Sequence, residues 1–528
     1  MNVGEIKKRL SSLKSERSNW ETLWQDIGDY IFTRKNTVLV KRTQGEDRQF
    51  YLYDNTGPQS LELLAGNLHS LLTSSTQQWF ELTTGDEHLD SLDDVRLFLQ
   101  KLTTKTHNIL NNSNFQMEVH ELYMDIGGFG TGLLAVEPDE EDVVRFLCKF
   151  IADAYIKEDS RGRVNEVYLE YEWNARQIVQ EYGVDALSEK VKRAYDNNED
   201  IKFKVTHAVY PMKEKDARGF TYESVHCLLE EKHELKRHGF KELPFVVPRW
   251  SKASGETYGR SPAMVALPEV KVLNKMVETT LIGAEKVVDP PLQAPDDGFI
   301  SQLNTFPGGI SYYRAGSNDQ IRPVFNDSRI DFGFQVIQEK QSKIRDAFYV
   351  NQLQLRTGPQ MTATEVMQRT EEQMRFLGPF LGRMQSEFLR PLLDRVVDIM
   401  FSRGVIDPRE VPPIIRSRKI DVRYSSFVAK SQRVGEGQNI MRFVQTIEPF
   451  INADQSAVDN LNADGAINRL SIIYGVPQDI LRNKKELENV RKARAEAQQQ
   501  MASEQKQMLQ AEQAQKLGSV MAQKGNNG

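Results

Sequence analysis

The chain has little cysteine and no long apolar run. Its 528 residues include only two cysteines, Cys148 and Cys227, which excludes a disulfide-stapled scaffold and gives no CxxC motif for a metal or a redox centre. No stretch reaches the roughly 18 consecutive apolar residues that a membrane helix needs, and the first residues lack the pattern of a signal peptide. We therefore expect a protein of a reducing cytoplasm that has no membrane partner and is not exported by the usual route.

Positive charge is not in excess either. The formal net charge is -6 and the sequence pI is near 5.9, which argues against a protein that coats nucleic acid with lysine and arginine. Any contact with DNA must then be loose or local. At 39% hydrophobic residues and this length, the chain can still bury a substantial core.

Motifs of catalysis and nucleotide binding are missing. The sequence holds no GxxxxGK[ST], no Gly-x-Ser-x-Gly and no HExxH. Four glycines lie at positions 127, 128, 130 and 132, but a GxGxxG loop would need glycine in place of Leu133. We interpret this stretch as a tight turn between a helix and a strand, and we expect no enzymatic activity and no cofactor.

Two groups of residues could suggest a metal site. Adjacent residues of a strand point to opposite faces, so His226 and Cys227 would not converge with His233 and His238 on one zinc ion. A solvated turn between two strands explains the acidic run better than a cation site; its members are Glu137, Asp139, Glu140, Glu141 and Asp142. We expect no metal.

Hydrophobic periodicity predicts a mainly helical α+β protein. Helical spacing predicts helices over residues 4–32, 57–72, 91–110 and 115–126. Alternating patterns predict strands ending at Gly85 and over residues 133–136, 143–150, 164–173, 201–210 and 220–229. A hairpin turn at 160–162 and a short helix between Asn174 and Gly183 complete this part.

The next section predicts two helices around a small insert. Ser261 and Pro262 begin a helix that runs to Asp289, with Pro268 either kinking it or starting its long part. Residues 291–332 are dense in Gly, Pro, Asn and Asp, and helical spacing returns over 334–350. If the two helices are antiparallel, they form a helical hairpin with the insert at its tip.

A punctuated loop at 351–361 leads into a long helix. The capping box from Thr362 to Glu365 begins this helix, Gly378, Pro379 and Pro391 are its expected bends, and Gly404 closes it. Further on we expect a Pro-rich connector at 408–413, a strand at 420–424, helices over 431–450, 453–474 and 478–481, and a polar helix from 483 to about 517. Residues 518–528 are expected to be disordered.

Several local motifs resemble those of one protein family. Residues 258–262 read YGRSP, 266–268 read ALP and 273–274 read LN; residues 362–366 read TATEV before Arg369, and 377–379 read LGP. Residues 54–57 read DNTG, and the glycine-rich stretch 127–132 adds support. Together with the order of elements, these motifs resemble the portal, or head-to-tail connector, proteins of short-tailed bacteriophages (podoviruses of the autographivirus-like kind). The resemblance is weakest after about residue 483.

The resemblance implies the portal fold, assembled as a homo-dodecameric ring at the unique capsid vertex. By residue order, the wing is 1–257, the first stem helix 258–290, the clip 291–332 and the second stem helix 333–350. The tunnel loop is then 351–361, the long kinked spine helix 362–403, the wing return 404–430, the crown 431–482, the barrel-like C-terminal helix 483–517 and the disordered tail 518–528.

The resemblance also implies where DNA and partners would touch the chain. The tunnel-loop candidates for DNA contact are Gln352, Gln354, Arg356, Thr357 and Gln360. The stem candidates are Glu278, Glu285, Lys286, Lys340 and Lys343. The clip candidates for docking the terminase motor and then the tail adaptor are Asp296, Asp297, Tyr312, Tyr313, Arg314 and Arg322.

The implied partners are further copies of the chain, double-stranded DNA in the channel, the major capsid protein, a scaffolding protein, the large terminase subunit, tail adaptor or tail tube proteins, and internal core proteins. The implied location is the head–tail junction of the virion, with the host cytoplasm during assembly. The alternative is a tail adaptor or scaffold-type helical protein without a DNA channel, although such a protein would lack a large β-containing body.

Charge in the implied stem and clip suits a conduit. Between Arg260 and Val350 the chain has 10 basic and 11 acidic residues, a net charge of -1. Each firm phosphate contact adds affinity that would have to be broken at every step of DNA movement. Near-neutral walls favour sliding, with at most one basic ring from Arg356.

Overall fold

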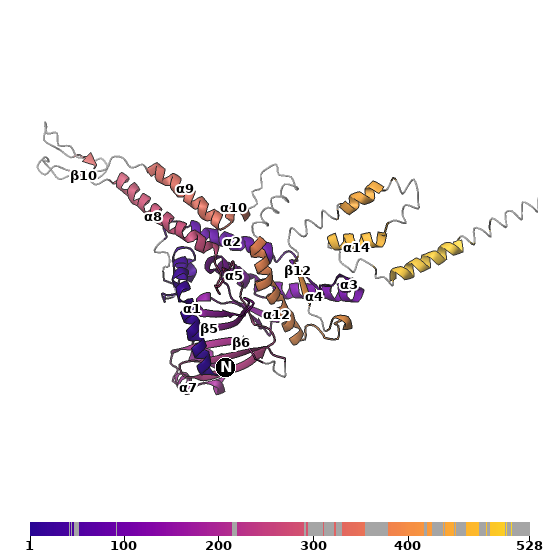
Figure 1. Ribbon diagram of the computed structural model, residues 1–528, viewed down its shortest axis with the longest axis horizontal. Coiled ribbons are helices and arrows are strands. Elements are labelled where there is room, and N and C mark those ends of the chain that lie inside the picture. The colour runs from indigo at the N-terminus through magenta and orange to yellow at the C-terminus, as the bar shows by residue number, and fades with distance from the viewer. Residues whose placement is uncertain are drawn as a thin grey trace, which may run out of the picture. The chain divides into compact units, whose positions relative to one another are not determined.

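The chain forms two compact units, whose helices and strands are labelled in Figure 1. The computed structural model describes residues 1–41, 52–90, 92–213, 219–289, 330–353, 378–416 and 420–424, with shorter pieces between these ranges and as far as residue 508. The first unit comprises 1–82, 102–411 and 420–428, and the second comprises 83–101, 412–419 and 429–528. No helix among the described residues has the length and apolar character needed to span a bilayer.

The first unit contains most of the secondary structure. Its helices are α1 (Val3–Tyr30), α2 (Thr56–Leu72), α5 (Phe115–Phe129), α6 (Ala175–Tyr182), α7 (Glu189–Asp196), α8 (Pro262–Val288), α9 (Ile330–Ala347), α10 (Val350–Leu353) and α12 (Arg390–Ser402). Short 3-10 turns are η1 (Thr33–Lys35), η2 (Ile151–Asp153) and η3 (Val184–Ala186). The expectation of a mainly helical α+β protein is confirmed.

The largest sheet is a five-stranded antiparallel meander in the order β4-β5-β6-β7-β8. Its strands are β4 (Ala154–Glu158), β5 (Val164–Asn174), β6 (Lys202–Pro211), β7 (Tyr222–Leu228) and β8 (His233–Phe240). The predicted hairpin turn lies between β4 and β5, where Gly162 has φ +75°. The sequence patterns found β5, β6 and β7 but missed β4 and β8, whose exposed positions follow no clean alternation.

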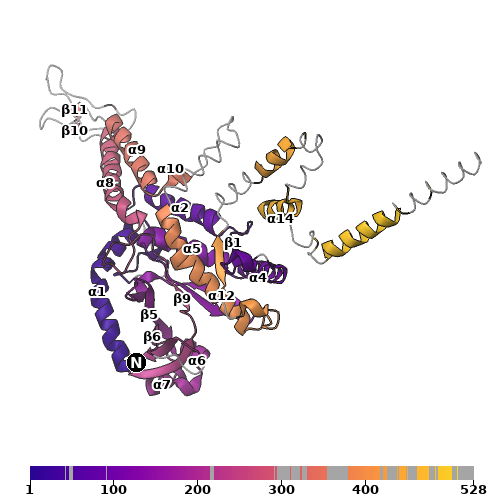
Figure 2. The same ribbon diagram turned by 45° about the vertical axis from the view of Figure 1, so that its right-hand side comes forward.

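Helices cover both faces of this sheet, as both views show (Figures 1 and 2). On one face α1 packs with Ile6, Leu10 and Leu13, which are one helical turn apart, against alternate strand residues such as Tyr168 and Ala208. On the other face, α6 and α7 pack against the opposite strand positions, among them Phe203 and Val205. The predicted helix at α6 is confirmed, with Asn174 and Gln177 forming a capping box.

Three smaller sheets contain the other described strands. Strands β2 (Leu134–Pro138), β3 (Val144–Cys148) and β9 (Phe245–Val246) form a three-stranded sheet in the order β3-β2-β9. Two-stranded pairs join β1 (Phe80–Thr83) to β12 (Asp421–Tyr424), and β10 (Leu292–Gln293) to β11 (Arg322–Pro323). The strand β9 is too short for periodicity to detect.

The expected glycine turn at 127–132 is partly wrong. Helix α5 continues to Phe129, so Gly127 and Gly128 are helical, and the turn begins only at Gly130 with φ +81°. A Cβ at Gly127 would lie 2.8 Å from the Leu61 side chain, and one at Gly128 would lie 3.2 Å from Phe32. Tertiary packing of α2 and the end of α1 against α5 therefore overrides the weak helix propensity of glycine.

The long kinked helix is described from Gly378 onward. Helical residues 378–384 lead into η4, a π-helical turn (Gln385–Leu389), and then into α12, which ends at Ser402 with Gly404 at φ +72°. The expected bend at Pro391 coincides with this π turn, where the Arg390 N–H bonds to the Gln385 carbonyl, five residues back. The predicted capping box at 362–365 lies outside the described residues.

The second unit is described only in part. It includes α3 (Glu87–Asp90), the first half of α4 (Asp93–Asn112), η5 (Pro413–Ile415), α14 (Ala463–Tyr474) and helical residues from 486 to 501. Arg491 pairs with Asp464 at 2.6 Å, both side chains being exposed. The described part of the helix expected over 431–450 is helical, whereas the helix expected over 453–474 begins only at Ala463, because residues 461 and 462 are described and not helical. The helix expected at 478–481 and the tail at 518–528 lie outside the described residues.

Candidate functional site: the paired helices and their base

Two helices of the first unit, α8 and α9, lie side by side and project from the rest of that unit in both views (Figures 1 and 2). Lys340 of α9 pairs with Glu269 of α8 at 2.7 Å, and Gly333 faces Thr280 further out. Residues nearer the C-terminal end of α8 face residues nearer the N-terminal end of α9, so the two helices are antiparallel. The short strands β10 and β11 pair antiparallel at the outer end, which agrees with the expected helical hairpin with a β-containing insert at its tip.

Helix α8 begins where the sequence predicts. Ser261 Oγ accepts a hydrogen bond from the Met264 N–H at 3.1 Å and donates one to the Gly128 carbonyl at 2.6 Å. Pro262 occupies the first turn, and Pro268 lies inside the continuous helix α8. Of the two possibilities at Pro268, a separate start there is therefore wrong.

The YGRSP motif fixes the root of α8 to the unit. The Tyr258 ring meets the Trp24 ring edge-on at 5.2 Å, and the Tyr258 hydroxyl accepts the Ile156 N–H at 3.3 Å. The backbones of Gly259 and Gly130 approach so closely that a Cβ on either residue would collide with the other. The motif is thus a packing joint between α8, α5 and α1, and not a ligand loop.

The LN and DNTG motifs meet at the base of the helix pair. Asn274 is buried, its Oδ1 accepts the N–H groups of Tyr53 and Asp54 at 2.8 and 3.2 Å, and its Nδ2 donates to the Val270 carbonyl at 2.9 Å. Asp54 in turn accepts a hydrogen bond from Gln341 Nε2 of α9 at 2.8 Å. Both helices are therefore fastened to the same short segment before α2.

Beyond Asn274 the pair changes character. All of the buried residues of α8 lie between Pro262 and Asn274. The outer part exposes large apolar side chains, with exposed fractions of 50% for Leu281, 86% for Val288 and 54% for Phe334. The inner part also exposes Val265 and Val272, but beside a buried face that the outer part of α8 lacks. Ile282 and Val287 are exposed as well. One copy of the chain leaves this outer apolar surface uncovered.

The charges on the helix pair balance, and several of them form ion pairs within it. Helices α8 and α9 each carry three basic and three acidic residues. Among the stem candidates, Lys340 pairs with Glu269, Lys343 with Glu339 and Glu278 with Lys275, at distances of 2.7 to 2.9 Å. Glu285 and Lys286 lie exposed near the outer end of α8. The structure brings these candidates together on one helix pair.

The segment expected as a loop at 351–361 begins as a helix. Residues Asn351, Gln352 and Leu353 belong to α10, which packs on α2, so the prediction of a loop is wrong for them. The other DNA-contact candidates, Gln354, Arg356, Thr357 and Gln360, lie outside the described residues. Helix α9 also begins earlier than expected, at Ile330, so residues 330–332 are helical.

The clip candidates are mostly outside the described residues. Asp296, Asp297, Tyr312, Tyr313 and Arg314 are among these, while Arg322 lies in β11 opposite Gln293. Sequence reasoning missed Gln341 at the base, because a polar side chain that closes a tertiary joint has no periodic signature. Asn274 is visible in the sequence only as part of the LN motif.

The metal-like groups have ordinary structural roles. Cys227 is buried with the α1 face of the sheet, whereas the His226 ring stacks on His207 at 3.8 Å and bonds to the Tyr182 hydroxyl on the other face. Asp139 accepts the backbone N–H groups of Asp142 and Glu141 in the turn between β2 and β3, and these bonds lower its pKa. Within the described part of the chain, no group of three or more His, Cys, Asp or Glu residues could hold a metal.

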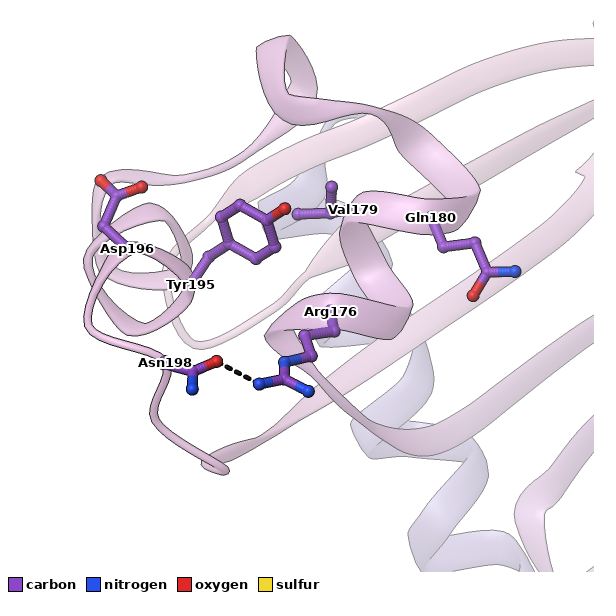
Figure 3. A pocket seen from close by; sticks show the side chains of 6 residues that line it. All are labelled: Arg176, Val179, Gln180, Tyr195, Asp196 and Asn198. Atoms are coloured by element: carbon purple, nitrogen blue, oxygen red, sulfur yellow. Dashed lines mark hydrogen bonds between the residues drawn. The ribbon is translucent and has the colours of Figure 1, made fainter.

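A shallow pocket lies between α6 and α7, far along the chain from the helix pair. Figure 3 shows Tyr195 and Val179 on its floor and Arg176 bonded to Asn198 at its rim. The side chains around it include no cluster of acids, bases or nucleophiles that could act on a substrate. It is not a candidate active site.

Comparison with known proteins gives the family. Residues 3–481 match the family described as bacteriophage head to tail connecting protein. The chain is 31% identical over 506 residues to the probable portal protein of Bordetella phage BPP-1, and 28% identical over 508 residues to the portal protein of Salmonella phage epsilon15. In both cases 93% of this chain and 91% of the relative are covered.

This chain therefore belongs to the bacteriophage head-to-tail connecting protein family, and its role is that of a portal protein at the junction of head and tail. Solved structures similar to this chain include the virion and the empty-particle neck of a gene transfer agent, each with 12% identity and a TM-score of 0.34. They cover 74% and 77% of this chain, and 85% and 90% of those chains. The low score gives this likeness no weight here.

Proposed function

We propose that copies of this chain form a closed dodecameric ring whose α8–α9 pairs line a channel for double-stranded DNA. The observation that carries the proposal is the helix pair: the buried residues of α8 all lie in its base, and the outer part of the pair exposes Leu281, Val288 and Phe334. Covering such side chains contributes roughly 1–2 kcal/mol each. Neighbouring copies, arranged head to tail around an axis, would supply that cover for every pair at once.

The charge of the helices supports a channel that does not grip DNA. Because α8 and α9 are each neutral and three of the stem candidates are in ion pairs within the pair, few free cations remain to bind phosphate. Arg356 then supplies the basic contact, in a segment that handles DNA together with Gln352, Gln354, Thr357 and Gln360.

The ring has further expected partners. In this proposal the insert at 291–332 docks the terminase motor during packaging and the tail adaptor afterwards, and the wing meets the major capsid protein, a scaffolding protein and internal core proteins. Assembly takes place in the host cytoplasm, where the ring nucleates the procapsid. The chain itself acts as a structural component and not as an enzyme.

Native mass spectrometry and negative-stain imaging of the purified chain test the ring. We expect closed rings with a central hole and a mass of twelve copies; a chain that remains monomeric at micromolar concentration contradicts the proposal. Deletion of 354–360 then tests the DNA-handling segment. The deletion should leave rings intact but impair packaging or DNA retention, and normal retention would remove the assignment of this segment.

The docking surface has its own test. Replacing Tyr312 and Tyr313 together by alanine should weaken association of the ring with the terminase motor and the tail adaptor while ring formation is unchanged. Replacing exposed Tyr195 by alanine in the α6–α7 region is the matched control. If the double substitution leaves both associations intact, the insert is not the docking surface.

A further inference from the structure

Two adjacent residues, Arg249 and Trp250, are held rigidly in the first unit. They follow β9, where the Trp250 N–H donates to the Gly130 carbonyl at 2.9 Å and Arg249 forms a backbone bridge with Thr131. Both side chains are buried, with exposed fractions of 1% and 8%. They therefore provide a rigid support next to the contact between Gly130 and Gly259 at the start of α8.

The Trp250 ring contacts two residues that are far apart in sequence. It stacks on Phe380 with centroids 4.0 Å apart and an interplanar angle of 29°, and on Tyr349 at 5.9 Å and 30°. Tyr349 lies between α9 and α10, and Phe380 lies in the helical residues before η4. One ring thus holds the chain on both sides of residues 354–377.

The backbone at Tyr349 needs such support. Its φ is +58°, in the left-handed region that bulky side chains rarely adopt, and this conformation separates α9 from α10. Local hydrogen bonds hold the kink, from the Tyr349 N–H to the Asp346 carbonyl and from the Leu353 N–H to the Tyr349 carbonyl. The aromatic stack adds the tertiary contact that fixes its direction.

Arg249 fixes the other side. Its guanidinium pairs with Glu387 of η4 at 2.8 Å and with Glu158 of β4. Phe380 and Glu387 are seven residues apart, about two turns along one face of a helix. Neighbouring residues of the unit therefore hold this helical run at two points, which sets its position and its rotation.

We propose that Trp250, with Tyr349 and Phe380, is an aromatic clasp that positions the two ends of residues 354–377, which include the proposed DNA-handling residues 354–360. The inference rests on the proposed function of that segment and adds which residues outside it fix where it emerges. These are positioning residues, since no contact of their own with DNA is required. Loosening the clasp should leave ring formation intact but change the presentation of the segment.

Limited trypsin digestion of assembled rings tests the clasp directly. Arg356, Arg369 and Arg375 are the cleavage sites within the segment. Tyr349→Ala should speed cleavage at these sites by about tenfold, the change expected when an aromatic pair that restrains a segment is lost. Tyr349→Phe keeps the stack and should restore the wild-type rate.

A matched control removes an aromatic ring elsewhere. Phe220→Ala breaks a ring contact with His238 at 5.8 Å in the sheet and should change neither the cleavage rate nor DNA retention. If Tyr349→Ala rings do not form, Phe380→Leu takes their place, because it keeps an apolar side chain and removes the stack. Unchanged cleavage in rings of either variant overturns the clasp.

Packaging assays separate this inference from the function on which it rests. If deletion of 354–360 impairs DNA retention but Tyr349→Ala does not, the segment handles DNA without the clasp and the inference is wrong. If the deletion has no effect on retention, the assignment of the segment fails, and the trypsin rates alone decide whether the clasp restrains it.

Discussion

The inner and outer parts of the helix pair differ in what holds them. The inner part, up to Asn274, holds all of the buried residues of α8 and is fastened by hydrogen bonds to the segment before α2, although Val265 and Val272 on it are exposed. The outer part of α8 has no buried residue, and it combines exposed apolar side chains with an ion pair inside the helix. The inner part is thus anchored within a single chain. The outer part has the composition of a surface that identical copies of the chain would cover.

Ring formation is the property most sensitive to the outer part. Replacing Leu281 by Glu and Ile282 by Lys together should abolish rings, because both side chains are exposed in one copy and would place charges between neighbours. The variant should remain a folded monomer, and its thermal unfolding midpoint should match that of the wild-type monomer. Native mass spectrometry and thermal unfolding measure both. Val184→Glu, at a similarly exposed apolar side chain of η3, is the control; rings that survive the double change would mean that the outer apolar surface is not an interface.

Stability is the property most sensitive to buried charge near the root. Burial lowers the pKa of Arg249, but the Glu387 and Glu158 carboxylates more than offset this and raise it. Glu387→Gln removes one of these partners and should cost about 3–5 kcal/mol of unfolding free energy, measured by urea titration. Glu339→Gln, in the exposed pair with Lys343, should leave the urea midpoint unchanged. If the two substitutions lower the unfolding free energy equally, the buried ion pair of Arg249 is no more important for stability than the exposed pair on α9.

The polar joint at Asn274 sharpens the same contrast. Asn274→Ala leaves two backbone N–H groups without their acceptor and should cost about 2–4 kcal/mol. Asn274→Asp keeps the accepting oxygen and should cost less. The measurement is the urea midpoint, with hydrogen exchange at Tyr53 and Asp54 as a local readout. Protection of these amides in the alanine variant would show that Asn274 does not fasten the helix pair.

Acid should destabilise the five-stranded sheet more than the helix pair. Burial, then the charges of Lys236 and His238, lower the pKa of His226 to about 4. The unfolded chain therefore binds the proton more readily between about pH 6.5 and 4, so stability is complete above this window and falls as the pH falls through it. At pH 5 we expect a loss of about 2 kcal/mol relative to pH 7.5.

His226→Gln should flatten that pH dependence, as measured by thermal unfolding from pH 7.5 to 5. The groups that face the histidine pair are Tyr171, Tyr182, Ser224, Phe245, Lys149, Lys236 and His238. Of these groups, only the His238 imidazole has an ordinary pKa close to the window. A variant with the wild-type pH profile would assign the acid sensitivity to another group.

Much of the fold could be predicted from the sequence where local chemistry decides it. The helix start at Ser261 and Pro262, the capped helix after Asn174 and the stop at Gly404 depend on neighbouring residues, and all three are confirmed. Strands β4 and β8 and the helical state of Gly127 depend on distant partners, and the sequence patterns missed them. The base of the helix pair was visible only as motifs of a family, because Asn274, Asp54 and Gln341 meet from three separate parts of the chain.

The π turn before α12 has a consequence for the spacing of residues along this helix. A π turn accommodates one residue more than regular α-helix, and here it absorbs the missing N–H of Pro391. Deleting one residue from Gln385–Leu389 would convert it to ordinary helix and rotate residues 378–384 by about 100° relative to α12. Phe380 would then turn away from Trp250. Insertions and deletions in this helix are therefore compatible with the stack only if they keep Phe380 on the face that points to Trp250.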